Sequence, residues 1–183
     1  GSFQSQSRGS DCTLCPQGSY CALQSVLPLP CEAGSFGARA NLTSQTNCSA
    51  CPIGSYCTSG ATAPEKCTAG RYGAEAELGD SGCSGACASG HYCVTGSNSS
   101  TATACPVGHF NPSESAAAAT ACQPCSIGTH ANTTGMRTCI DCARDTFQNV
   151  SGGAACHSCS ECGEGEWETA PCTGFTDRTC AWC

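Results

Sequence analysis

Large apolar side chains are sparse along this chain, and most of its aromatic residues recur at one place in a short repeated motif. The motif reads Cys-x-x-Gly-x-aromatic, as in residues 51–56, and is called the hexad below. Eight of the eleven aromatic residues occupy its last position. Its leading cysteines follow at steps of 16 to 20 residues, a spacing typical of a repeat array in which neighbours stabilise each unit. They are Cys15, Cys31, Cys51, Cys67, Cys87, Cys105, Cys125, Cys142 and Cys162.

Each hexad predicts a tight turn followed by a short strand. Glycine tolerates positive φ, and Asp145, which replaces it in one copy, tolerates it better than most residues. His130 replaces the ring in another copy. We expect the ring to lie over a disulfide, and the chain to form two-stranded hairpins joined by loops. Residues 115–121 are rich in alanine but too short for an isolated helix, so they are predicted to be a loop.

Composition points to a scaffold held by disulfides. Cysteine accounts for 22 of the 183 residues, whereas large aliphatic residues are too few to build a central hydrophobic core. A disulfide that closes a loop of about 15 residues stabilises a fold by about 3 kcal/mol. Such bonds persist in an oxidising compartment. The predicted fold class is therefore small, disulfide-rich and mostly irregular, with short β-hairpins in an elongated tandem-repeat rod. The predicted location is extracellular or at the cell surface.

The cysteine spacing also divides the chain into units. We expect a flexible leader without cysteines, followed by three longer repeats, a shorter one, a further module and the start of another unit. In order these are residues 1–11, 12–48, 48–83, 83–122, 122–141, 142–180 and 181–183.

The charge pattern excludes several classes of partner. The net charge is −7 and Lys66 is the only lysine, so the sequence offers no basic patch for nucleic acid or anionic membranes. No run of about 20 apolar residues is available to insert into a bilayer. The expected partners are other extracellular proteins, above all copies of the same chain or neighbouring repeats.

Several residues invite a chemical role, yet each fits a structural one better. Cys122, Cys125, Cys139 and Cys142 have nearly zinc-ribbon spacing, but the same step recurs along the whole cysteine array. Three of the four histidines lie at or beside the ring position and follow the repeat. Glutamates around Trp167 fit a solvated acidic face better than a calcium site, and Trp167 itself is expected to pack on its own disulfides. We therefore predict no catalytic residue, no metal and no cofactor.

Acceptor triplets for N-glycosylation support an extracellular location. The triplet Asn-x-Ser/Thr occurs five times, and Pro112 excludes Asn111. The triplet at Asn47 is the weakest, because it contains Cys48. The predicted glycosylated residues are Asn41, Asn98, Asn132, Asn149 and, last in rank, Asn47.

Two families share parts of this pattern. Residues 142–180 resemble a cysteine-rich module of the tumour-necrosis-factor-receptor family, through their cysteine spacing and the sequences Pro171-Cys172-Thr173 and Asp177-Arg178-Thr179-Cys180. The frame Cys-Pro-x-Gly-x-Tyr-Cys, at residues 15–21 and 51–57, resembles the ephrin-receptor-like cysteine-rich repeat, and this likeness covers most of residues 12–122. The third copy departs from it, with Ala88 in place of proline.

The first resemblance implies a disulfide pairing. In the receptor module it would be Cys142–Cys156, Cys159–Cys172 and Cys162–Cys180. The same logic, extended along the chain, favours Cys125–Cys139 and a crossed pairing of Cys15–Cys31, Cys21–Cys48, Cys51–Cys67, Cys57–Cys83, Cys87–Cys105 and Cys93–Cys122. A sequential pairing in the three longer repeats, such as Cys15–Cys21 with Cys31–Cys48, remains open.

Cys12 and Cys183 are left unpaired within the chain by this scheme. One interpretation is that the chain is a window of a longer array. The other is that Cys183 of one copy bonds Cys12 of the next, which would give a covalent head-to-tail polymer.

Two functions remain. The first is a non-catalytic structural or adhesive segment of a glycosylated surface fibre, since ephrin-receptor-like repeats occur in such fibres, including flagellar hairs. The alternative is a receptor ectodomain that binds a protein ligand. The small, bland loops favour the fibre, because ligand-binding hot spots need exposed Trp, Tyr or Arg.

Overall fold

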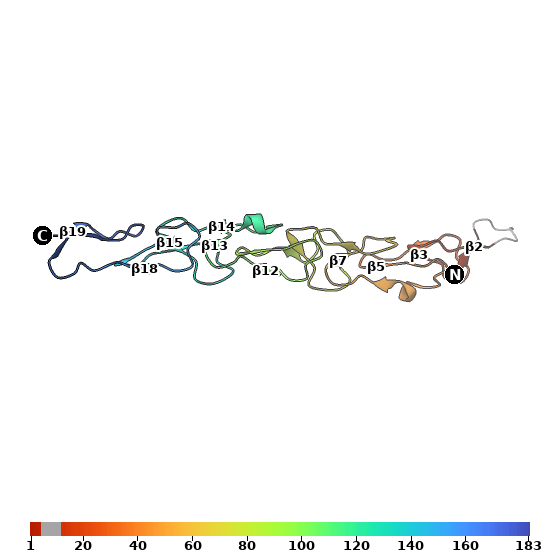
Figure 1. Cartoon of the computed structure of the whole chain (residues 1–183). Coiled ribbons are helices and arrows are strands. Elements are labelled where there is room, and N and C mark those ends of the chain that lie inside the picture. The colour runs from red at the N-terminus through yellow and green to blue at the C-terminus, as the bar shows by residue number, and fades with distance from the viewer. Residues whose placement is uncertain (5–11) are drawn as a thin grey trace. The chain divides into compact units, whose positions relative to one another are not determined.

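The computed structural model describes residues 1–4 and 12–183, and it consists of short antiparallel hairpins connected by loops (Figure 1). In unit 1, described below, the strands are β1 (Ser2–Phe3), β2 (Thr13–Leu14), β3 (Ser19–Tyr20), β4 (Leu29–Pro30), β5 (Ser35–Phe36), β6 (Ser49–Ala50), β7 (Ser55–Tyr56), β8 (Glu65–Lys66), β9 (Arg71–Tyr72) and β10 (Gly85–Ala86). In unit 2 they are β11 (His91–Tyr92), β12 (Thr103–Ala104), β13 (His109–Phe110), β14 (Gln123–Pro124), β15 (Thr129–His130), β16 (Ile140–Asp141), β17 (Thr146–Phe147), β18 (His157–Ser158), β19 (Glu166–Ala170) and β20 (Thr179–Trp182).

The chain divides into two compact units. Unit 1 comprises Gly1–Ala86 and Cys93–Ser100, and unit 2 comprises Cys87–Tyr92 and Thr101–Cys183. In the described residues each contains two-stranded sheets made of consecutive strands, together with one single-turn 3₁₀ helix, η1 (Gln45–Asn47) or η2 (Ala119–Ala121). The helix η2 lies within the alanine-rich run that was predicted to be a loop. None of the helices in the described part of the chain has the length and apolar character needed to span a bilayer.

The first seven hexads build their hairpins in the same way. The residue before the ring and the ring itself form the first strand, and the two residues before the next leading cysteine form the second, as in Ser55↔Lys66 and Tyr56↔Glu65. In the hexad at Cys142 the second strand precedes Cys159 instead, and the last hexad pairs longer strands. The backbone N–H of the next leading cysteine then donates to the carbonyl of the hexad glycine, as Cys67 does to Gly54 at 2.9 Å. The hexad thus specifies both a strand and its closure.

The turn predicted at the hexad glycine is confirmed. All eight hexad glycines have φ between 75° and 91°, and Asp145 has φ of 60°. Sterics also demand glycine at several of these positions. A Cβ on Gly54 would overlap the carbonyl oxygen of Gly96, a loop residue that follows the hexad two copies further along the chain. Gly18, Gly34, Gly90 and Gly108 meet the loops two copies ahead of them in the same way, at Gly60, Glu77, Gly135 and Gly152.

Cysteine fills the core of both units. The largest fully buried side chains are Asn111 and ten cysteines, and within residues 1–4 and 12–183 no Leu, Ile, Val, Phe, Tyr, Trp or Met is buried. Ala116 and Ala131 are the other buried apolar residues of this described part. The prediction of a disulfide-rich, nearly helix-free fold without a hydrophobic core in the described units is therefore confirmed.

The cysteines after Cys12 and before Cys183 are all oxidised, and the longer repeats use the sequential pairing. The bonds there are Cys15–Cys21, Cys31–Cys48, Cys51–Cys57, Cys67–Cys83 and Cys105–Cys122, while Cys87 and Cys93 are also disulfide-bonded. The crossed pairs Cys15–Cys31, Cys21–Cys48, Cys51–Cys67, Cys57–Cys83, Cys87–Cys105 and Cys93–Cys122 are therefore wrong.

The hexad turn explains this correction. The positive φ at Gly54 folds the chain back, so that the Cα atoms of Cys51 and Cys57 lie 5.9 Å apart. That separation suits a disulfide. The resemblance that suggested crossing was carried over from a module whose first bridge closes a longer loop.

The first residues of the chain are also ordered differently from the predicted leader. Gly1-Ser2-Phe3 repeats the glycine-x-ring part of a hexad, since β1 pairs with β2 and the Cys15 N–H donates to the Gly1 carbonyl at 3.0 Å. The prediction of a flexible leader is thus wrong for residues 1–4. The rest of it, residues 5–11, lies outside the described residues.

Candidate functional site

The C-terminal module, residues 142–180, differs from the other repeats in its bonds and its strands. It contains Cys142–Cys156, followed by the crossed pair Cys159–Cys172 and Cys162–Cys180, as predicted. The predicted Cys125–Cys139 bond precedes it. The hairpin of β19 and β20 is the longest of the described part of the chain, with a register shift between Glu168 and Ala170.

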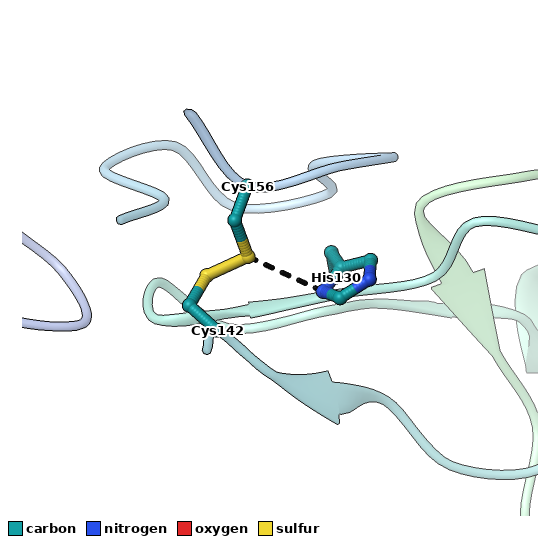
Figure 2. A group of neighbouring side chains, drawn as sticks. All are labelled: His130, Cys142 and Cys156. Atoms are coloured by element: carbon teal, nitrogen blue, oxygen red, sulfur yellow. Dashed lines mark hydrogen bonds between the residues drawn. A yellow bond between two sulfur atoms is a disulfide. The ribbon is translucent and has the colours of Figure 1, made fainter. Parts of the chain in front are cut away.

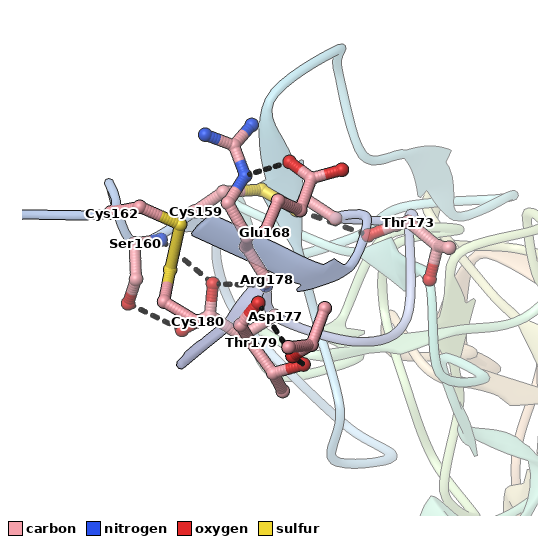
Figure 3. Close-up of polar contacts among 11 residues, drawn as sticks. Cys159, Ser160, Cys162, Glu168, Thr173, Asp177, Arg178, Thr179 and Cys180 are labelled. Atoms are coloured by element: carbon pink, nitrogen blue, oxygen red, sulfur yellow. Dashed lines mark hydrogen bonds and ion pairs between the residues drawn. A yellow bond between two sulfur atoms is a disulfide. The ribbon is translucent and has the colours of Figure 1, made fainter. Parts of the chain in front are cut away.

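Asp177 ties the two crossed disulfides together through a polar network (Figure 3). Its carboxylate accepts hydrogen bonds from the backbone N–H of Ser160 at 2.7 Å and from the Ser160 hydroxyl at 2.6 Å, and also from the Arg178 N–H at 2.7 Å. The hydrogen bonds from Ser160, and then the charge and N–H of Arg178, lower the pKa of Asp177 below its ordinary value. The ionised carboxylate therefore fixes the segment between Cys159 and Cys162 to the segment that leads into Cys180.

Other side chains extend this network across the hairpin. Arg178 Nε lies 2.9 Å from Glu168 Oε2, and both side chains are partly exposed. Thr169 donates to the carbonyl of Thr179 at 3.0 Å, on the strand opposite. A surface ion pair of this kind contributes little stability on its own, so its main effect is to orient the two side chains.

Large aromatic side chains are exposed in this part of the chain. The exposed fraction is 55% for Trp167, 51% for Phe175 and 75% for Trp182. The other hexad rings are half-buried. Trp167 is therefore more exposed than the rings of the other hexads, and its partner across the hairpin is the small Ala181.

The acidic residues of the module do not gather around an ion-sized space. Glu166 accepts a hydrogen bond from the Gly163 N–H at 2.8 Å and Glu168 pairs with Arg178, whereas Glu161 and Glu164 are exposed. Two groups in the described residues have ligand-like spacing: His130 with Cys142 and Cys156, and Cys159 and Cys172 with Asp177. Their sulfurs are in disulfides and not thiolates, so neither group offers the donors that zinc prefers. The four cysteines with zinc-ribbon spacing are oxidised as well.

Three of the four histidines make contacts within their own repeat, whereas His130 contacts a cysteine of the next one. Nδ1 of His91 lies 3.2 Å from the Ser89 carbonyl and that of His109 lies 3.3 Å from the Val107 carbonyl, equivalent local contacts that follow the repeat. The His157 ring packs against Phe147. His130 differs, because it fills the ring position, and its Nδ1 lies 3.3 Å from Cys156 Sγ (Figure 2). The replacement of a ring by histidine was the sequence signal for this contact.

The five predicted glycosylation sites are all exposed. They differ in their hydrogen bonds. Asn47 Oδ1 accepts from the hydroxyls of Thr43 at 2.8 Å and Ser44 at 3.1 Å, and Asn41 Oδ1 accepts from the N-terminal amine. The structure records no such bonds for the side chains of Asn98, Asn132 and Asn149.

Comparison with known proteins identifies one part of the chain. The model of the TNFR/NGFR cysteine-rich region matches residues 142–180, the interval that the cysteine spacing and the Asp-Arg-x-Cys sequence had indicated. This is well under half of the chain. Modules of this type are non-enzymatic and bind extracellular proteins, and the many disulfides also fit an extracellular protein. No curated protein matched the chain.

Proposed function

We propose that this chain is a non-catalytic segment of an extracellular receptor-like protein, and that residues 142–183 contact a protein ligand. The observation that carries the proposal is the match of residues 142–180 to the receptor module, whose three disulfides this chain forms. The bonds hold a long hairpin whose side chains are largely solvent-exposed.

The exposed aromatic side chains support this proposal over the fibre. Hot spots of protein interfaces are enriched in Trp, Tyr and Arg, and burying an exposed tryptophan removes a large apolar area from water. Trp167 and Trp182 both have this exposure, and Arg178 is oriented by Glu168 on the same hairpin. The sequence argument against a receptor rested on the absence of such side chains.

A binding panel tests the proposal. The full chain, biotinylated and tetramerised, is applied to cells that each display one extracellular ligand of the tumour-necrosis-factor type. We expect saturable binding to at least one of them, weakened about tenfold or more by Trp167→Ala, as for an interface hot spot. Leu23→Ala is the matched control, because Leu23 is 99% exposed but lies outside the module. Absence of binding across the panel, or equal loss with both variants, would reject the proposal.

The second candidate is the structural fibre, which the backbone contacts between repeats favour. Hexad glycines and loop residues two copies apart meet through main-chain atoms, so the contact tolerates changes in side chains. Cys12 and Cys183 are exposed free thiols, which is what a covalent head-to-tail assembly of copies requires. Non-reducing electrophoresis after mild oxidation tests this: a ladder of multimers that Cys12→Ser abolishes supports the fibre, and a monomer band rejects the covalent assembly.

We further propose that the chain carries N-glycans on Asn98, Asn132 and Asn149. Their side chains are exposed and the acceptor nitrogen needs that access. Occupancy of Asn47 is expected to be lowest, since its amide oxygen is engaged and the residue lies beside the disulfide-bonded Cys48. Glycopeptide mapping of material secreted by eukaryotic cells measures this order, and high occupancy of Asn47 would contradict it.

A further inference from the structure

His130 is the one hexad residue whose ring carries a hydrogen-bond donor directed at a disulfide. The Cys156 sulfur has no hydrogen, because it is bonded to Cys142, so the 3.3 Å contact is a hydrogen bond in the tautomer of His130 that carries its proton on Nδ1 (Figure 2). Seven of the other eight copies carry Phe or Tyr at this position, and one carries Trp. The contact therefore places a proton beside one sulfur of one particular bond.

We propose that Cys142–Cys156 is a site of thiol–disulfide exchange, opened by an external dithiol with the help of His130. The inference does not depend on the proposed function. An attacking thiolate forms a bond to Cys142 Sγ, the Cys142–Cys156 bond breaks, and its electron pair leaves with Cys156 Sγ. The second thiol of the reagent then displaces Cys142, so the protein gains two electrons and two protons and the dithiol becomes a cyclic disulfide.

The imidazole acts on the leaving sulfur. Exchange is faster when the departing thiol has a lower pKa, and a hydrogen-bond donor beside a thiolate lowers the pKa of that thiol. In the proposed step the reagent attacks Cys142, and Cys156 departs as a thiolate next to the Nδ1–H of His130. His130 is thus a positioning and charge-stabilising residue for this one bond.

Access alone does not select this bond. Cys142 and Cys156 are half-buried, but so are the cysteines of the two crossed disulfides that follow. Cys125–Cys139 is the closest comparison, since it closes a loop with the same sequence separation of 14, yet Cys125 is fully buried. The hexad before it supplies Phe110 where the hexad before Cys142 supplies His130. The histidine is what distinguishes Cys142–Cys156 from its equally exposed neighbours.

Partial reduction of the native chain tests the proposal. The folded protein is treated with limiting dithiothreitol, alkylated at intervals with N-ethylmaleimide and mapped by mass spectrometry. We expect Cys142 and Cys156 to be labelled first, before Cys125 and Cys139 and before the crossed disulfides. An order in which any other disulfide opens first would overturn the proposal, and this measurement needs no variant.

Two substitutions isolate the histidine. His130→Phe and His130→Tyr install rings that other hexads carry, so the hairpin is expected to form. Each should slow the opening of Cys142–Cys156 by about tenfold, while the rate at Cys125–Cys139 stays unchanged. Unchanged opening of Cys142–Cys156 in both variants would refute the role of His130. A variant that misfolds is recognised by faster opening of all bonds in the module, and then the other variant decides.

Discussion

The repeats around Cys51–Cys83 and the module at residues 142–180 are both held together by disulfides, but the contacts around these disulfides differ. In the repeats, Cys51, Cys57 and Cys67 are almost completely buried, and the backbone of one copy packs on another. In the module every cysteine is half-exposed, and side-chain hydrogen bonds around Asp177 connect the disulfides instead. The comparison shows that disulfides fill the core of the repeats, whereas in the module they cross-link segments that are partly exposed.

The largest difference is expected from removing a disulfide in each region. Cys67→Ala with Cys83→Ala should cost about 4 kcal/mol, since it loses loop closure and also a buried side chain. Cys159→Ala with Cys172→Ala should cost about 3 kcal/mol, mainly from loop closure. Native-state hydrogen exchange of the Ser84 and Ser160 amides reports the two local free energies of opening. A larger cost in the module would invert the comparison.

Glycine substitutions separate backbone packing from backbone strain. Gly54→Ala places a Cβ on the carbonyl of Gly96 and also strains a positive φ, and should destabilise its hairpin by about 3 kcal/mol. Gly165→Ala has a similar φ of 82°, but the nearest atom to its Cβ is a Trp182 ring carbon at 3.5 Å. It should cost about 1–2 kcal/mol. Hydrogen exchange at Cys67 and Cys183 measures both, and equal costs would show that packing between copies adds nothing.

The polar network predicts a pH dependence confined to the module. Because folding lowers the pKa of Asp177, the stabilisation is present above the carboxyl's unfolded pKa and is lost as the pH falls through the lower folded value. Protection of the Ser160 amide should therefore fall in acid, and Asp177→Asn should weaken it at neutral pH and remove most of the pH dependence. Glu161→Gln, an exposed change in the same module, is the control. If the protection of the Ser160 amide still fell in acid in Asp177→Asn, groups other than Asp177 would cause the pH dependence.

The smallest effect is expected from the surface ion pair. Glu168→Gln should change the free energy of opening of the hairpin by less than about 1 kcal/mol, because the Glu168 side chain is 44% exposed and screened by salt. The difference from the unaltered chain should disappear in high salt, and Glu164→Gln should show no such difference. Thermal melts at two salt concentrations are sufficient. A loss that persists in salt would mean that Arg178 holds the hairpin by more than charge.

Local features of the fold were predictable from sequence. The hexad glycines determine the turns, the ring and the residue before it form the first strand, and the lack of large aliphatic residues leaves cysteine as the core. The pairing of the module, Cys159–Cys172 with Cys162–Cys180, followed from its resemblance to a known pattern. These predictions depend on short stretches of chain, where steric preference decides.

The disulfide pairing of the longer repeats and the contacts between segments were not predictable in the same way. The crossed pairing assigned to Cys15, Cys21, Cys31 and Cys48 failed because spacing leaves several pairings possible, and the turn at Gly18 decides between them. The exposure of Trp167 and the contact of His130 with Cys156 depend on which residues of another segment lie beside the ring. A repeated motif shows that copies are equivalent, but not what covers each one.

Five hexad glycines meet a loop two copies ahead, and this gives the array a period of two. The spacing reflects it, because steps of 16 to 18 residues alternate with steps of 20. A gene rearrangement that inserts or deletes a single hexad would bring loops of the wrong length against the glycines on both sides of the junction. One that duplicates two hexads keeps every such contact, so arrays of this kind can lengthen or shorten by pairs.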